Sequence, residues 1–176
     1  MAGVLILIVF FVTTLALNLT ILGQQSHAIN GTENDVNQWF KNYDSIRRQA
    51  KMSLREKLSM LRLLSLAMGP FALPVDESKK LLLKMIERYD EAIQSLEKLS
   101  RLPQTEELQT GYIKYFTDGK QLFHDTLESP LDNPEAQRKR LNELMERKHE
   151  LERLDIANKA LDARLRKEFH IPAFHG

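Results

Sequence analysis

The stretch DESKKLLLKMIERYDEAIQSLEKLS, residues 76–100, decides the fold class of this chain. Its apolar residues recur at steps of three and four, which is the spacing of one face of an α-helix. The stripe consists of Leu82, Ile86, Tyr89, Ile93 and Leu96. Asp76 is a suitable N-cap, and Leu102-Pro103 ends the pattern. The spacing therefore predicts an amphipathic helix over 76–100.

The same helical spacing continues on both sides of this stretch. Proline-containing breaks separate the periodic segments, at Gly69-Pro70, Pro103 and Ser129-Pro130. Thr105 is a candidate N-cap, and Pro134 suits the first position of a helix. The expected helices cover residues 35–68, 76–100, 105–128 and 134–169.

Short connections between these segments favour antiparallel neighbours. We expect an all-α domain over 35–169, built as a four-helix antiparallel bundle or a coiled-coil-like helical domain. A polar linker over 24–34 precedes this domain, and a tail over 170–176 follows it.

The N-terminal end has a different character from the rest of the chain. No Asp, Glu, Lys or Arg occurs before Glu33, and Ala2 to Leu22 is almost entirely apolar. As a helix, such a stretch would cover roughly 30 Å, which matches the hydrocarbon core of a bilayer. The sequence predicts a single-pass membrane protein in which residues 1–23 form a transmembrane anchor and residues 2–22 contact lipid.

A cleaved signal peptide is the alternative interpretation of this end. Ser26-His27-Ala28 resembles a small-x-small cleavage site, which would place the signal at residues 1–28 and give an exported or periplasmic protein. The apolar run is longer than the roughly 7–15 residues of a typical signal and has no basic residue before it. The anchor is therefore favoured. The charge pattern does not indicate on which side of the membrane the domain lies.

The fourth segment, 134–169, is polar and carries only a narrow apolar seam with heptad spacing. The seam consists of Leu144, Leu151, Leu154, Asn158, Leu161 and Leu165. Such a seam suits contact with one other helix, either in the same chain or in a second subunit. An Asn at an a position, such as Asn158, can specify the register or the oligomeric state of that contact.

Motifs that would indicate chemistry are scarce. The chain has no Cys, no Gly-rich phosphate loop and no nucleophile elbow. Glu146 and His149 have the Glu-x-x-His spacing of helical di-iron sites, but the motif occurs once and a solvated helix face explains it better. The net charge of +1 gives no argument for nucleic acid. We expect no catalytic residue, no cofactor and no metal site.

Two segments resemble parts of an uncharacterised cyanobacterial family. They are TEELQTGYIKYFTDGKQLF, residues 105–123, and LDIANKALDARLRKEFHIP, residues 154–172. The similar proteins have a single N-terminal membrane span and a helical body. The likeness covers the last third to half of the chain. It implies a membrane setting but no activity and no functional residues.

These observations favour a membrane-anchored, non-catalytic protein with a protein-interaction, scaffold or assembly role, whose partner is another protein. A secreted or periplasmic helical binding protein, released by cleavage after Ala28, is the alternative. A metal-dependent helical-bundle enzyme built on Glu146 and His149 is a third and weaker hypothesis.

Overall fold

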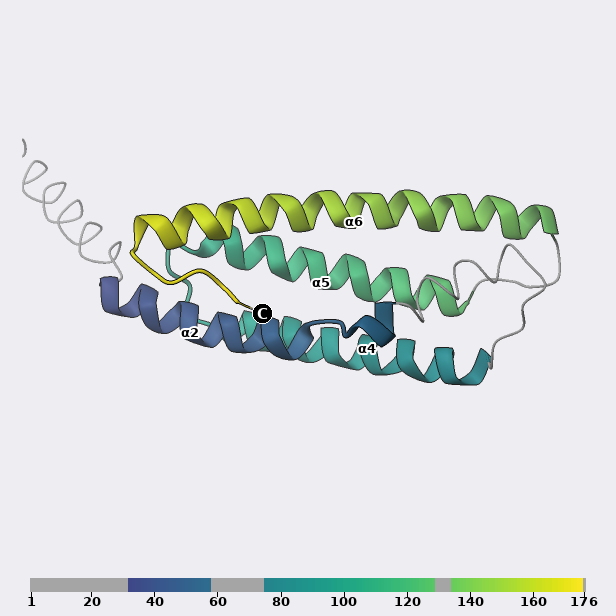
Figure 1. The fold of residues 1–176 in the computed structure, drawn as a ribbon, viewed down its shortest axis with the longest axis horizontal. Coiled ribbons are helices and arrows are strands. Elements are labelled where there is room, and N and C mark those ends of the chain that lie inside the picture. Colours follow the sequence, from purple (N-terminus) through teal and green to yellow (C-terminus); the bar gives the residue numbers. More distant parts are fainter. Residues whose placement is uncertain (1–31, 58–74, 129–133, 176) are drawn as a thin grey trace, which may run out of the picture.

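The computed structural model describes residues 32–57, 75–128 and 134–175, and in these ranges it is helical without any β-strand (Figure 1). The main helices are α2 (Glu33–Ala50), α4 (Val75–Glu97), α5 (Glu106–Leu127) and α6 (Pro134–Glu168). The prediction of an all-α domain is confirmed. The expected anchor, residues 1–23, lies outside the described ranges. Within those ranges, every helix is too short or too polar to span a membrane.

The four helices form a bundle in which successive helices run in alternating directions (Figure 1). The longest helix, α6, extends along the whole bundle, and α5 packs between it and α4. On the other side, α2 packs against α4. The closest packing is therefore between α2 and α4, α4 and α5, and α5 and α6, while α2 and α6 approach each other on the remaining side.

One capping box starts helix α2, and a second one, just beyond the end of α2, starts the next helical turn. At its start, Thr32 Oγ1 accepts a hydrogen bond from the Asp35 amide at 3.3 Å, and Asp35 Oδ2 accepts one from the Thr32 amide at 2.8 Å. After Ala50, Lys51 is extended. Ser53 and Glu56 then form the second box, with the Ser53 amide 2.7 Å from Glu56 Oε2. A new helical turn begins at residue 54.

This second box departs from the sequence-based expectation of one helix over 35–68. The Ser-x-x-Glu pattern at Ser53 offers the backbone a new N-terminus, so the chain turns before the apolar pattern ends. The other boundaries lie close to those expected. Helix α6 starts at Pro134, and Thr105 occupies the N-cap of α5, although its side chain makes no capping hydrogen bond.

The apolar core joins all four helices. In α4 the predicted stripe faces inward: Leu82, Ile86, Tyr89 and Leu96 are buried, and Ile93 is partly buried. Aromatic side chains from α2 and α5 complete the core, namely Trp39, Phe40, Tyr43, Tyr112, Phe116 and Phe123. Many of these rings meet edge to face or at a tilt, as in the contact of Tyr89 with Phe116 at 4.9 Å between centroids.

Candidate functional site

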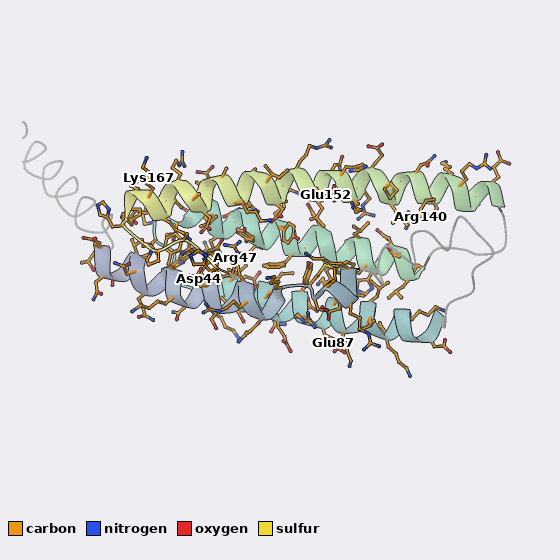
Figure 2. The ribbon with its side chains drawn as sticks, in the orientation of Figure 1. Asp44, Arg47, Glu87, Arg140, Glu152 and Lys167 are labelled. Atoms are coloured by element: carbon orange, nitrogen blue, oxygen red, sulfur yellow. The ribbon has the colours of Figure 1, made fainter. Side chains whose placement is uncertain are left out.

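The side of the bundle between α2 and α6 is bridged by charged side chains. Arg47 Nη1 of α2 lies 3.1 Å from Asp162 Oδ2 of α6. In the other direction, Arg166 of α6 forms an ion pair with Asp44 of α2. Arg166 Nε also lies 2.9 Å from Oδ1 of Asp162 in its own helix. Figure 2 shows Asp44 and Arg47 between the two helices, whereas Lys167 points outward. Long ion-paired side chains hold α2 and α6 together without bringing their backbones close.

The C-terminal tail packs onto this bridge. Arg166 Nη1 donates a hydrogen bond to the Pro172 carbonyl at 2.8 Å. The ring of Phe174 lies 4.2 Å from the Arg47 guanidinium carbon and 5.9 Å from that of Arg166. These cation–π distances show that the tail is part of the bridge, whereas the sequence suggested only a short extension after the last helix.

Beside the bridge runs a groove that consists of two adjoining cavities. One has a volume of about 460 Å³ and includes Arg47, and the other has a volume of about 330 Å³ and includes Phe123. We call these parts the Arg47 end and the Phe123 end. Both are lined by Met52, Lys57, Tyr89, Tyr115 and Asp155. The groove therefore follows α6, with tyrosines from α4 and α5 as its floor and residues 52 and 57 on its other side.

The two ends differ in charge. The lining of the Arg47 end includes five basic side chains, Arg47, Lys51, Lys57, Lys159 and Arg166, but only two acidic ones, Asp155 and Asp162. The lining of the Phe123 end is balanced, with Lys57 and Lys148 against Glu152 and Asp155, and it also contains Leu122 and Leu151. The groove is thus basic at one end and neutral and apolar at the other.

The tyrosine hydroxyls at the site stay protonated near neutral pH. Burial raises the pKa of Tyr89 and of Tyr43 well above the usual value, and it raises the pKa of Tyr112 to about 12. The rings of Tyr43 and Tyr112 meet edge to face with 5.5 Å between centroids, and their two hydroxyls interact with each other. These groups can donate hydrogen bonds, but they are poorly suited to act as general bases.

The predicted seam of the last helix lies against the same chain. Leu144, Asn158 and Leu165 are buried, and Leu151, Leu154 and Leu161 are partly buried. Asn158 packs so tightly on α5 that a Cβ added at Gly111 would lie 2.3 Å from its Oδ1. Leu151 and Asn158, which occupy two a positions of the predicted seam, therefore both pack against α5. Leu151 also contributes to the groove.

The other candidate residues do not converge on the groove. Glu146 and His149 are exposed on α6, and His149 Nδ1 lies 3.2 Å from Glu152 Oε2. Across the described ranges, no group of three or more His, Asp or Glu side chains is arranged to hold a metal ion. Neither Glu146 nor His149 lines the groove, whereas Glu152, which contacts His149, does.

Sequence inspection missed the bridge and the groove. Asp162 and Arg166 have the i, i+4 spacing of an intrahelical ion pair, which is a weak signal because many surface pairs share it. Nothing in the spacing links them to Asp44 and Arg47 in a distant helix.

Comparisons with known proteins add no further assignment: no family model, no curated protein and no solved structure matches this sequence.

Proposed function

We propose that this protein is a non-catalytic interaction module, held at a membrane by residues 2–22, whose groove receives an apolar helical segment of a partner protein. The membrane part is supported by the uncharged apolar run that precedes Glu33. The resemblance to single-span proteins with a helical body points to the same setting.

One structural observation supports the interaction role above the others. The side between α2 and α6 is bridged by ion pairs, and beside this bridge the Phe123 end leaves a cavity of about 330 Å³ lined by Leu122, Phe123 and Leu151. An apolar floor between charged margins is the usual surface for helix-in-groove recognition. Because the charges at this end are balanced, the complementary segment is apolar and close to neutral.

The chemistry of the groove favours binding over catalysis. Its most buried charged groups, Arg47, Asp162 and Arg166, are paired with one another. Burial raises the pKa of Tyr89, Tyr112 and Tyr115 above the ordinary value, so these tyrosines are not activated as bases or nucleophiles. Such a lining positions a ligand but supplies no reactive group.

Site-specific photocrosslinking in membranes of cells expressing the full chain tests the interaction role. A photoreactive amino acid at Glu152 faces the Phe123 end, whereas one at Glu87 or at Lys167 points away from the bundle (Figure 2). We expect a discrete protein adduct from position 152 only, with the crosslink in an apolar helical segment of the partner. Adducts of equal yield from all three positions would contradict a specific groove partner, and an adduct of twice the chain mass would show self-association instead.

The anchor is tested independently by sequencing the N-terminus of the mature protein. A retained anchor leaves residues 2–22 in place, and the protein then stays in the membrane after alkaline carbonate extraction. A mature chain that begins at Ile29 would replace the anchor with the secreted or periplasmic alternative.

A further inference from the structure

The Arg47 end of the groove has an unusual charge for this molecule. Its lining contains five basic and two acidic side chains, and Arg166 also pairs with Asp44, which leaves an excess of two positive charges in a chain with a net charge of +1. A basic cavity attracts an anion more strongly than scattered surface lysines do, because its low-dielectric walls focus the electric field. The cavity is therefore electrostatically complementary to an anion.

Not all of these positive charges are neutralised internally. Arg47 and Arg166 pair with aspartates, and Lys159 Nζ lies 2.6 Å from Asp155 Oδ2 in a pair that is open to solvent. Lys51 and Lys57 form no ion pair within the described ranges. Lys57, from the helical turn after α2, and Lys159, from α6, both line the cavity. These two flexible ammonium groups can both reach an anion that enters between them.

The walls of the same cavity are aromatic. Its aromatic lining residues come from α4 and α5, namely Tyr89, Tyr112, Tyr115 and Phe116. Phe174 of the C-terminal tail also lines the cavity. The Arg47 guanidinium lies 4.8 Å from the Tyr112 ring and 4.2 Å from the Phe174 ring, and Asp162 binds it from α6. A flat ring can pack against such walls with offset or edge-to-face contacts.

The size of the cavity also suits a small ligand. The volume of about 460 Å³ lies within the range of roughly 300–1,000 Å³ that is typical of small-molecule pockets. Tyr112 also lines the cavity, and its buried hydroxyl interacts with that of Tyr43.

We infer that the Arg47 end binds a small planar aromatic anion, with its ring against the tyrosine floor and its charged group between Lys57 and Lys159. This binding site does not depend on the proposed membrane anchor or on a protein partner. It concerns the basic end of the groove, whereas the proposed partner segment occupies the neutral end.

Isothermal titration calorimetry of the full chain in lipid nanodiscs tests this site, with empty nanodiscs as the blank. The probes are naphthoate and the neutral naphthylmethanol, which share a ring system and differ in charge. We expect one naphthoate per chain and an affinity about tenfold higher than that of the alcohol. Raising the salt concentration from about 0.05 M to about 0.5 M weakens naphthoate binding and leaves the alcohol unaffected.

Substitutions locate the binding site. Lys57→Gln combined with Lys159→Gln removes two exposed charges from the cavity, so the fold is retained, and naphthoate affinity falls about tenfold. Lys84→Gln, an equivalent change on an exposed position of α4 outside the groove, leaves the affinity unchanged. Helical circular dichroism of each variant confirms that folding is unaffected.

Three results would overturn the inference. Equal affinities for the acid and the alcohol would show an apolar site without charge recognition. The absence of binding by both probes would show that the cavity does not accept ligands. Equal loss of naphthoate affinity in the Lys84 control and in the double variant would show attraction by overall charge instead of a defined site.

Discussion

Arg47 Nη1 of α2 and Asp162 Oδ2 of α6 belong to residues 115 positions apart in the sequence and lie 3.1 Å from each other in the α2–α6 bridge. Both side chains are about nine-tenths buried. A buried ion pair contributes modest net stability, but removing one partner leaves an uncompensated charge. The pair therefore specifies how α2 and α6 are arranged more than it strengthens the fold.

The first prediction concerns this pair. Asp162→Asn leaves Arg47 without its carboxylate partner and removes one of the two ion pairs of Arg166. The free energy of unfolding therefore falls by about 2–4 kcal/mol. Urea denaturation of the full chain, followed by circular dichroism, measures the change. Asp118→Asn is the control, because its pair with Lys114 is exposed and the expected change is within about 0.5 kcal/mol. Equal losses in the two variants would show that the bridge is not buried in solution.

The second prediction is a pH dependence that arises from Glu56. Its hydrogen bonds with Arg88 lower the pKa of this carboxyl from 4.5 to about 2, so the ionised form is stabilised in the folded state. The corresponding stability is present above pH 4.5 and is lost as the pH falls toward about 2.

Glu56→Gln removes this charge and keeps a side chain that can still act in the capping box. We expect the variant to be about 2–3 kcal/mol less stable than the wild type at neutral pH and nearly equal to it at pH about 2. Thermal or urea unfolding across this pH range tests the expectation. A difference that stays constant with pH would mean that the Glu56 carboxylate is not held by Arg88.

The third prediction concerns the close approach of α4 and α5. A Cβ at Gly119 would lie 2.7 Å from Cε2 of the buried Tyr89 ring, so Gly119→Ala forces the helices apart. We expect a loss of about 1–3 kcal/mol, despite the higher helix propensity of Ala. Thr110→Ala, on an exposed position of the same helix, should be neutral or slightly stabilising. A stabilised Gly119→Ala variant would contradict the packing of these two helices.

The fourth prediction concerns the end of α6. His170 has a φ of 55°, in the left-handed region, and the Ile171 amide bonds to the Arg166 carbonyl at 2.8 Å. This is a Schellman-type ending, in which glycine is the favoured residue. We expect His170→Gly to raise the free energy of unfolding by about 1 kcal/mol. Lys167→Gly, inside the helix, should lower it by a similar amount, and a destabilised His170→Gly variant would contradict the observed ending.

The fifth prediction is that residues 32–176, without the apolar N-terminal run, are soluble and strongly helical by circular dichroism. Retaining Thr32 preserves the capping box of α2. Helices α2, α4 and α5 bury apolar faces against each other and against the narrow apolar seam of α6, which leaves charged faces to the solvent. A mainly disordered spectrum, or aggregation equal to that of the full chain, would show that the described domain requires the N-terminal segment.

The helices were predictable because local signals determine them. The apolar stripe from Leu82 to Leu96 and the prolines at 103 and 134 define α4, α5 and α6 to within a few residues. The end of α2 was also encoded locally, by Ser53 and Glu56, but the continuing apolar pattern concealed it. Periodicity shows which face of a helix is buried and gives little information on where one helix stops and another starts.

The groove could not be predicted, because it depends on contacts between distant segments. The pairing of Arg47 with Asp162 and that of Asp44 with Arg166 exist only after α2 and α6 have been placed on opposite sides of a tyrosine floor. The individual residues looked like ordinary surface charges in amphipathic helices. Their significance comes from burial, which no spacing rule in a single sequence reports.

The long sequence separation across the α2–α6 bridge also affects the order of folding. Each helix packs on its neighbour in the sequence, α2 on α4, α4 on α5 and α5 on α6, whereas the bridge must close loops of 115 and 122 residues. Closure of the bridge is therefore the late step. Trp39, the only tryptophan, lies in α2 and is buried in the core, so its fluorescence reports the packing of α2 while circular dichroism reports helix formation. In refolding experiments the helical signal should precede the tryptophan signal.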